Sequence, residues 1–385
     1  MELNRIIILG NGFDLSHNLK TKYSDFIKDY YSKIIDSSFK DELLEFCIPG
    51  YQFNQMSSLK EMTSHMSYSL GSFSIRPPEM NLHFNQKLGI ILHSLFFYEI
   101  SRKSESKWVD IETDYFNKLL EIIDKKDTHN THKDVTSLNK EVDAIAKKFE
   151  QYLIDKIIPE IEFKHNSKTE DLFESKIARN KDQFQNFLKE FPEGYAKVIQ
   201  EETKGSFYKN HGRLNFNETL ILNFNYTNTA IELYSKHLQN CKIINIHGTL
   251  KDLNNPINLG FGDEMHSRYA DIEEANENEY LRLMKSFAYT NTDNYRQLFN
   301  FIEGNEFQVQ IMGHSCGISD RTLLNAIFEN PRCKSIKVFY HKLGGQKDNY
   351  SDIVRSISRH FNKKLLMRNK IVNKTLCREL PQLDE

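Results

Sequence analysis

Two glycines and an acidic residue follow the first apolar run of the chain, in a pattern that suits nucleotide binding. The run RIIIL ends at Leu9 and is followed by Gly10, Asn11, Gly12 and, two positions later, Asp14. Glycines after a strand let the backbone approach a diphosphate, and the next helix offers its N–H groups. An acid repels phosphate, so Asp14 suits ribose hydroxyl groups better. The alternative is structural: the glycines permit a tight turn and Asp14 caps a helix.

Polar side chains end two later apolar runs, at Asn225 and at His247. The carboxyl ends of neighbouring parallel strands share one edge of a sheet, so we expect both residues beside the first glycine turn, with His247 facing solvent. An imidazole transfers protons near neutral pH, whereas an amide holds a water or a sugar hydroxyl without titrating. Asn225 and His247 are therefore candidate catalytic residues. The alternative for His247 is a hydrogen-bonded structural imidazole.

A loop rich in small residues follows the apolar run FQVQIM. It contains Gly313, Ser315 and Asp320 and precedes a helical pattern, which again fits a phosphate or ribose contact. The loop also matches the GxSxG pattern of hydrolases, in which Ser315 would be the nucleophile and His341 or His360 the base. The hydrolase alternative leaves the first glycine turn without a role, so nucleotide binding is the preferred interpretation.

The segment WVDIE places two acids beside the only tryptophan of the chain. Burial of Glu112 against Trp108 would raise the pKa of its carboxyl group and suit it to general acid or base catalysis. The alternative is that Asp110 and Glu112 lie in the first turn of a helix beginning near Ile111, where acids interact favourably with the helix dipole.

Composition narrows the classes of function. The 385 residues include 51 Lys and Arg and 53 Asp and Glu, so the net charge of −2 disfavours nucleic-acid binding through bulk positive charge. The five cysteines lack the spacing of a zinc site, so we expect no metal, and their odd number favours a reduced setting. No apolar stretch is long enough to span a bilayer or to form the core of a signal peptide. We therefore expect a cytoplasmic protein that does not bind a membrane.

The candidate residues must be positioned by a sheet, because most of them end short apolar runs rich in β-branched residues. Such runs without polar alternation are typical of strands buried on both faces of a parallel sheet. We expect strands at 5–10, 218–225, 241–248, 307–314 and 335–341, and a last one at 364–367. Helical patterns that supply the crossovers lie at 229–237, 322–328 and 352–360.

The stretch between the first two predicted strands is mostly helical. Glycine is absent from 90–193, and apolar residues recur at helical spacing in three segments, 115–122, 138–153 and 184–191. A polar loop is expected at 128–134.

The predicted architecture is a Rossmann-like α/β fold with a mostly parallel sheet and a large helical insertion after the first βα unit. Residues 1–27 and 216–368 form the nucleotide-binding domain, 28–215 the insertion and 369–385 a C-terminal tail.

Five motifs occur in order along most of the chain: GNGFDL at 10–15, WVDIE at 108–112, FNYTNT at 224–229, HG at 247–248 and GHSCGISD at 313–320. Together they resemble the AbiH family of bacterial phage abortive-infection proteins. A more distant resemblance is to sirtuin-like domains of bacterial defence systems, several of which hydrolyse NAD. These resemblances imply a sirtuin-like nucleotide-binding sheet and a function in antiphage defence.

The sirtuin-like pattern, carried over to this sequence, implies roles for several residues. Asn225 and Tyr226 match the start of its Asn-Tyr-Asp element, His247 its catalytic histidine, and Ser315 with Asp320 its late cofactor loop. The chain departs from the pattern where the first turn reads GNGFD and not GAGxS, and where threonine at position 227 replaces aspartate. The cysteine spacings exclude the zinc module of deacylase sirtuins, which favours nucleotide hydrolysis over protein deacylation.

The resemblance implies that the protein binds a nucleotide such as NAD and cleaves its nicotinamide–ribose bond. Loss of nicotinamide leaves an oxocarbenium-like ribosyl centre, so the site must orient the leaving group and place a water. Asn225 would hold the water or the ribose, His247 would accept the proton, and the glycine loops would hold the diphosphate.

The alternative function is a nucleotide-responsive sensor or toxin scaffold without turnover. Such a protein would recognise a phage or host protein through its helical insertion. A helical segment of this size also suits a two-fold homodimer, or a lid over the cleft.

Overall fold

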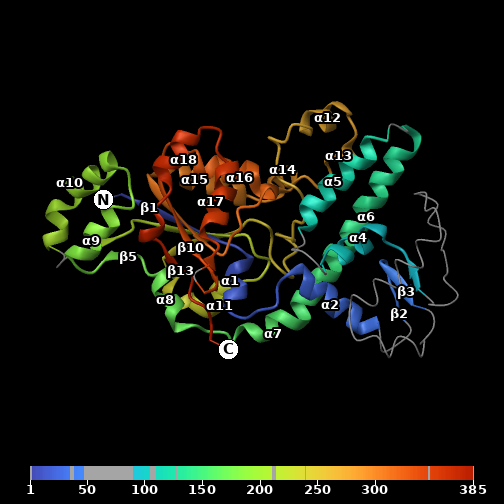
Figure 1. The fold of residues 1–385 in the computed structure, drawn as a ribbon, viewed down its shortest axis with the longest axis horizontal. Coiled ribbons are helices and arrows are strands. Elements are labelled where there is room, and N and C mark those ends of the chain that lie inside the picture. The colour runs from blue at the N-terminus through green and yellow to red at the C-terminus, as the bar shows by residue number, and fades with distance from the viewer. Residues whose placement is uncertain are drawn as a thin grey trace.

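The fold is built on a sheet of parallel strands with helices on both faces (Figure 1). The computed structural model describes residues 2–34, 39–46, 90–104, 110–125, 128–209, 214–238, 240–345 and 347–384. Within these residues the strands of the sheet are β1 (Asn4–Leu9), β7 (Thr219–Asn223), β8 (Cys241–Asn245), β9 (Phe307–Met312), β10 (Cys333–Tyr340) and β13 (Arg378–Glu379).

The order of the strands across the sheet is β13-β10-β9-β1-β7-β8. Numbered along the chain, these are the sixth, fifth, fourth, first, second and third strands, which is the strand order of the Rossmann fold. Every pairing is parallel, and Leu9 at the end of β1 stands between Asn223 of β7 and Met312 of β9. The prediction of a Rossmann-like sheet is confirmed. The strand order reverses between β1 and β9, where such sheets bind ligands.

The central strands are buried on both faces because alternate side chains enter different hydrophobic clusters. Ile6 and Ile8 of β1 point to one face, and Ile7 and Leu9 to the other. The first face is covered by α15 (Asn294–Gly304), α16 (Arg321–Phe328) and α17 (Tyr350–Arg359). The second is covered by α1 (Asn11–Ser16), α8 (Ser167–Phe173) and α11 (Thr229–Tyr234). Each fully buried aliphatic side chain contributes about 1.5–3 kcal/mol, so this double burial stabilises the sheet.

Most of the described helices between β1 and β7 form two groups at opposite ends of the sheet (Figure 1). The group at the carboxyl end contains α2 (Tyr23–Ile34), α4 (Leu95–Ser104), α5 (Ile111–Ile123) and α6 (Thr128–Tyr152). It packs with the later helices α12 (Tyr269–Glu274) and α13 (Asn278–Leu281). The group at the amino end contains β5 (Lys176–Ala178), α9 (Lys181–Leu188), α10 (Glu193–Lys209) and β6 (Leu214–Asn215).

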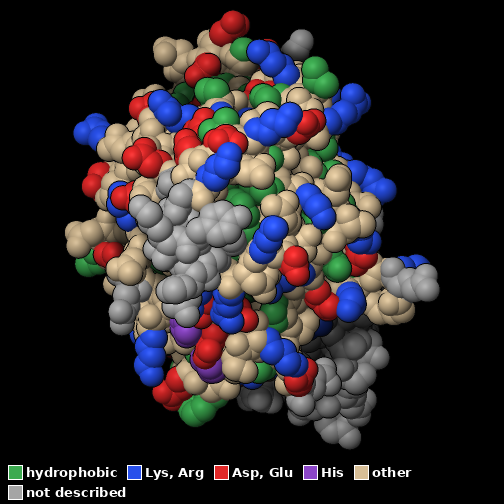
Figure 2. All heavy atoms as spheres, turned by 90° about the vertical axis from the view of Figure 1, so that its left-hand side faces the viewer, with side chains coloured by type: hydrophobic (Ala, Val, Ile, Leu, Met, Phe, Trp, Pro, Cys, Tyr) green, Lys and Arg blue, Asp and Glu red, His purple; other side chains and the backbone are tan. Residues whose placement is uncertain are grey.

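Shorter elements connect these layers. They are β2 (Phe39–Lys40), β3 (Leu44–Phe46), β4 (Ile90–Leu92), the π-helical turn η2 (Leu153–Ile157), α7 (Ile158–Ile161), η3 (Ser235–His237), α14 (Lys285–Ala288), η4 (Tyr289–Asn291), η5 (Ile318–Asp320), β11 (Lys342–Gly344), β12 (Lys347–Asp348), α18 (Lys364–Lys370) and η6 (Lys374–Leu376). Among the helices of the described ranges, none has both the length and the apolar composition needed to cross a bilayer. Figure 2 looks onto the end that carries α9 and α10, where basic and acidic side chains are interspersed.

Two local predictions are wrong. Residues 364–367 were expected to be the last strand but belong to helix α18, and Leu365 is largely exposed. A run of three apolar residues is too short to distinguish a strand from a helix turn. The sixth strand is β13, which pairs with Phe339 and Tyr340 of β10. The loop expected at 128–134 is the start of α6, and its polar composition did not distinguish the two, because the solvent-facing side of a helix is as polar as a loop.

The loops after β1 and β9 contact each other directly where the strand order reverses. Gly12 N donates a hydrogen bond to Gly313 O across 2.8 Å, and a Cβ on Gly10 would meet His314 Cα at 2.5 Å. Gly313 has a φ of +76°, and a Cβ there would lie 2.1 Å from Phe13 N. The close packing of the two loops therefore requires glycine at these positions.

We expect Gly313→Ala to lower the free energy of unfolding by about 1–3 kcal/mol or more, because the substitution adds a steric clash to a strained φ. Gly317→Ala in the same loop is the matched control, since its Cβ would meet only two serine hydroxyl oxygens at 3.7 Å. Urea unfolding of both variants measures the difference. Equal losses in the two variants would contradict the tight packing of the loops.

Candidate functional site

The carboxyl edge of the sheet brings together the loops that the sequence selected. Asn223 of β7 pairs with Asn245 of β8, so Asn225 and His247 follow their strands at equivalent positions. The loops that contain Gly12 and Ser315 follow β1 and β9 at the same edge. Four segments far apart in the sequence therefore meet where the strand order reverses, as predicted.

Asp14 links the loop after β1 to the loop after β7. Its carboxylate is 1% exposed and accepts hydrogen bonds from Thr227 Oγ1 at 2.6 Å and Asn225 Nδ2 at 3.3 Å. Asn225 Nδ2 also donates to Gly10 O at 3.2 Å. Burial raises the pKa of Asp14 to about 6, although the hydrogen bond from Thr227 opposes this rise. The contact of Asp14 with ribose hydroxyls stays a prediction, and it requires a ligand to replace one of these partners.

A buried lysine lies at the centre of the site. Lys285 is 0% exposed, and its Nζ lies 2.8 Å from Glu112 Oε2 and 2.7 Å from Asp320 Oδ1. Burial alone would lower the pKa of Lys285, but the two carboxylates hold it well above its usual value. Sequence analysis missed Lys285, because a single lysine in the segment LRLMKSFAY matches no motif.

Backbone pairing and aromatic stacking hold Lys285 against α5. Lys285 N donates to Phe261 O, and Phe261 N donates to Leu283 O, each at 3.0 Å. The Phe261 ring stacks on Phe116 with 4.0 Å between the ring centroids. Phe116 follows Glu112 by four residues on α5, so the two side chains share one face of that helix.

Glu112 is both a buried carboxyl group and an acid in the first turn of a helix, the two alternatives for the WVDIE motif. The helix begins at Ile111 as predicted, with Asp110 accepting a hydrogen bond from Thr113 N at 3.0 Å as its N-cap. Burial raises the pKa of Glu112 to about 7, with Lys285 opposing and Asp320 reinforcing the rise. Trp108 lies outside the described residues.

Asp320 has a histidine on each side. His247 Nε2 lies 3.0 Å from Asp320 Oδ1, and His314 Nε2 lies 3.5 Å from Asp320 Oδ2. His314 Nδ1 accepts a hydrogen bond from Cys316 N, so its proton is on the Nε2 that faces Asp320. Burial alone would raise the pKa of Asp320, but Lys285 and His247 hold it well below its usual value. Asp320 is therefore ionised at neutral pH.

The prediction that His247 faces solvent is wrong, because its side chain is 5% exposed and lies beside the rings of Phe224 and Tyr226. Burial, together with the charge of Lys285, lowers the pKa of His247 to about 4, so the imidazole is neutral at pH 7. The contact with Asp320 lacks hydrogen-bond geometry, which leaves His247 Nε2 buried without a hydrogen-bond partner in the part of the chain that the structure describes.

The loop with the GxSxG pattern lacks the geometry of a hydrolase nucleophile. In a nucleophile elbow the serine itself adopts the strained backbone conformation. In this loop Ser315 is exposed, and the residue with a positive φ is the next one, Cys316, at +52°. His360 Nε2 donates to Cys316 O at 2.9 Å, and His341 is exposed at the end of β10. Among the described residues no histidine is hydrogen-bonded to Ser315, so the loop holds no serine–histidine pair.

The strand order and the titratable side chains at the carboxyl edge define a Rossmann-like α/β protein with a candidate site where the strand order reverses. The chain belongs to the AbiH family, described as bacteriophage abortive infection AbiH, whose family model matches residues 6–342. No curated protein sequence matches it. Family membership confirms the resemblance carried by the five motifs and implies a function in phage abortive infection.

We expect Lys285→Met to lower the free energy of unfolding by about 3–5 kcal/mol, because it leaves two buried carboxylates without their cation. Without Lys285 the pKa values of Glu112 and Asp320 rise in the folded state. The loss of stability should therefore shrink as the pH falls and both groups become protonated, and grow as the pH rises. Urea unfolding from about pH 4 to about pH 8 measures both effects.

Lys236→Met is the matched control, since Lys236 is an exposed lysine that follows α11. Its effect should stay within about 0.5 kcal/mol at each pH. A loss in Lys285→Met that does not change with pH would contradict the assigned charges.

Proposed function

We propose that the protein binds a nucleotide such as NAD at the carboxyl edge of the sheet and hydrolyses its nicotinamide–ribose bond. The observation that carries this proposal is the pair of carboxylates, Glu112 and Asp320, on either side of Lys285. Their environments separate their pKa values: that of Glu112 rises to about 7, while that of Asp320 falls well below its usual value. Such a pair supplies one proton-transfer group and one permanent negative charge at neutral pH.

Each group has a task in the cleavage of an N-glycosidic bond. The ionised Asp320 stabilises the positive charge that develops on the ribosyl centre, and Glu112 accepts the proton of the attacking water. Asn225 Oδ1, which has no hydrogen-bond partner within the described residues, accepts from that water or from a ribose hydroxyl. His247 is better suited to positioning than to proton acceptance, because its pKa of about 4 makes it a weak base.

The nucleotide contacts stay those assigned from the sequence, with one added condition. Gly10, Gly12 and the 313–317 loop, which contains Gly313 and Ser315, hold the diphosphate, and Asn11 and Tyr226 are further nucleotide contacts. Gly12 N already donates to Gly313 O, and Asn11 Oδ1 accepts from Thr21 Oγ1. The loops after β1 and β9 must therefore separate when the diphosphate binds.

The contact between these loops also supports the second candidate function, a sensor that binds the nucleotide without turnover. Separation of the loops on binding would change the surface at the carboxyl edge, where the helices of the 28–215 insertion pack. A phage-encoded or host protein would recognise that change, and the same helices would form a homodimer. Both candidate functions are compatible with the proposed sirtuin-like ancestry of the sheet.

Asp14 and Thr227 supply a further argument for the sirtuin-like ancestry. The sirtuin-like pattern has serine in the first turn and aspartate after Asn-Tyr, whereas this chain has aspartate at 14 and threonine at 227. Thr227 Oγ1 donates to Asp14 Oδ2 at 2.6 Å, so a hydroxyl and a carboxylate meet at these two positions, each where the pattern has the other group. The two departures from the pattern compensate each other.

The exchange predicts a rescue. Thr227→Asp alone should lower the free energy of unfolding by about 2 kcal/mol or more, because a second carboxylate would face the buried Asp14. Adding Asp14→Ser should restore most of that loss, since one carboxylate and one hydroxyl again meet. A double-mutant cycle on urea unfolding measures the coupling. Simple additivity of the two substitutions would contradict the compensation.

Turnover is tested by incubating the purified protein with NAD and measuring free nicotinamide by chromatography. We expect the natural sequence to release nicotinamide. The rate of release should fall by about 100-fold or more in Glu112→Gln, because the variant lacks the proton acceptor. The natural rate should rise with pH up to about 7 and then level off, since only ionised Glu112 accepts a proton.

Glu121→Gln, an exposed substitution on the same helix, is the control and should keep the natural rate. Binding of NAD without nicotinamide release would select the sensor function. Neither binding nor release would contradict both functions.

A further inference from the structure

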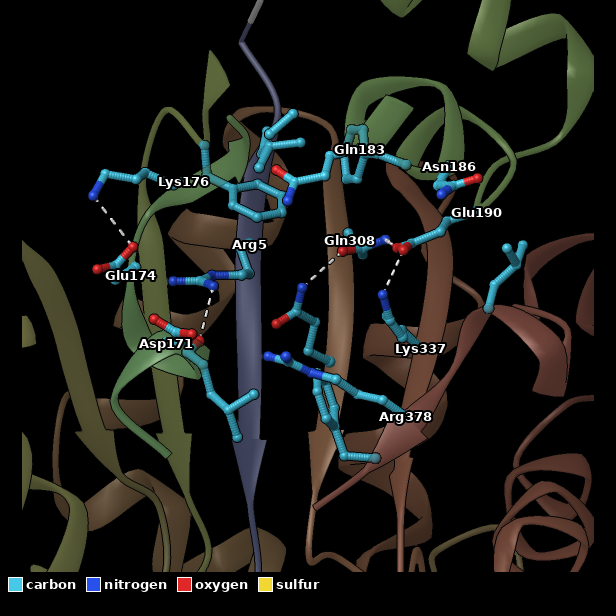
Figure 3. A pocket seen from close by; sticks show the side chains of 18 of the residues that line it. Arg5, Asp171, Glu174, Lys176, Gln183, Asn186, Glu190, Gln308, Lys337 and Arg378 are labelled. Atoms are coloured by element: carbon cyan, nitrogen blue, oxygen red, sulfur yellow. Dashed lines mark hydrogen bonds and ion pairs between the residues drawn. The ribbon is translucent and has the colours of Figure 1, made fainter. Parts of the chain in front are cut away.

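A cavity of about 670 Å³ lies on the face of the sheet that α8 covers, and its lining extends from Arg5 near the start of β1 to Arg378 of β13. Its walls come from β1, β9, β10 and β13 on one side and from α8, β5 and α9 on the other (Figure 3). The lining residues include none of the residues of the candidate site described above. The cavity is therefore treated as a separate site.

The face of the sheet that lines this cavity changes from apolar to polar toward its amino end. Ile7 and Met312 belong to the hydrophobic cluster on that face. Arg5, Gln308 and Gln310 point to the same face of the same two strands, nearer to their amino ends, and are also buried. Burying such groups costs free energy unless each finds a polar partner. Their partners therefore decide what the cavity can bind.

Most of these polar groups are satisfied within the protein. Gln310 Nε2 donates to Gln308 Oε1, and Gln308 Nε2 donates to Glu190 Oε2, each at 2.9 Å. Lys337 of β10 forms an ion pair with the other oxygen of Glu190. Gln310 Oε1 is left without a hydrogen-bond partner within the described residues, and it lines the cavity.

Arg5 is held by backbone carbonyl groups. Its guanidinium donates to Leu172 O and Phe173 O, both at 3.1 Å, at the end of α8. Burial lowers the pKa of Arg5 to about 10, so the side chain is still charged at neutral pH. Arg5 Nε also donates to Thr219 Oγ1 at 3.3 Å, so Arg5 brings to the cavity a positive charge whose hydrogen-bond partners are all uncharged.

The lining of the cavity has more basic than acidic side chains. The basic residues are Arg5, Lys176, Arg179, Lys337 and Arg378, and the acidic ones are Asp171, Glu174 and Glu190. The three acids pair with Lys176, Arg179 and Lys337.

Arg5 and Arg378 have no carboxylate partner among the described residues. Arg378 lies over the ring of Phe339, with its guanidinium carbon 5.4 Å from the ring centroid, and reaches over the strands toward the side of Arg5 (Figure 3). Two guanidinium groups in one cavity thus lack a direct ion pair in the described part of the chain, although the charges of Asp171 and Glu190 act on Arg378 from a longer distance.

We propose that this cavity is a second ligand site, which binds a small phosphate ester of the nucleoside monophosphate class. A phosphate carries up to two negative charges and matches the planar donors of arginine, so Arg378 and Arg5 recognise it. The free amide oxygen of Gln310 accepts a hydrogen bond from an N–H or O–H group of the same ligand. The C-terminal residues that contribute Arg378 complete the cavity. The proposal does not depend on NAD binding at the carboxyl edge.

Isothermal titration calorimetry with AMP, adenosine and inorganic phosphate tests the site on the full chain. AMP should bind the natural sequence, and Arg378→Gln should weaken that binding roughly tenfold or more, because a charge-assisted hydrogen bond to phosphate is lost. Adenosine, which lacks the phosphate, should bind the natural sequence no more tightly than AMP binds Arg378→Gln. Inorganic phosphate should compete with AMP at higher concentration.

Arg355→Gln, which removes an exposed arginine of α17, is the matched control and should bind AMP as the natural sequence does. The proposal is overturned if AMP does not bind, if adenosine binds equally well, or if Arg378→Gln binds AMP as tightly as the natural sequence does.

Discussion

The ion pairs of Lys285 with Glu112 and Asp320 are the interaction on which the carboxyl edge of this protein depends. All three side chains are largely removed from solvent, and an unpaired charge at such a depth costs several kcal/mol. The three residues come from α14, α5 and the end of η5, which are far apart in the sequence. Their charges are stable only when the three segments are docked together, so the helical group at the carboxyl end and the sheet form their site as one unit.

The same ion pairs distribute protons among the neighbouring side chains. Lys285 favours the ionised form of Asp320, and with burial it disfavours a charged His247, whose imidazole is neutral as a result. Glu112 is left with a pKa of about 7 because its burial outweighs its contact with the lysine. Burial therefore makes His247 a weaker base than its position in the sequence suggested. In the proposed hydrolysis the proton acceptor is therefore Glu112, which the sequence marked only as one of two alternatives.

The sequence predicted the parts of the fold that repeat a local pattern. The five longer strands are apolar runs, and their ends place Asn225, His247 and Ser315 at one edge without any knowledge of tertiary contacts. The strand β13 has only two residues, Arg-Glu, and pairs through its backbone, so no hydrophobic pattern marks it. Lys285 was missed for a related reason. Its importance comes from two acids that are distant in the sequence, and nothing next to it indicates that it is buried.

The side chains of strand β1 change from polar to apolar between the two ends of the sheet. It begins with the polar Asn4 and Arg5, continues with four apolar residues to Leu9 and is followed by Gly10, and every one of these positions is buried. A purely structural strand in the middle of a sheet would bury apolar side chains throughout, because each polar group needs a partner. Arg5 finds its partners in the carbonyl groups that end α8, and Gly10 finds its place against the loop after β9. Close packing of the loops explains Gly10, whereas the packing of apolar side chains does not explain the charged Arg5, whose end of β1 lines a cavity with titratable groups.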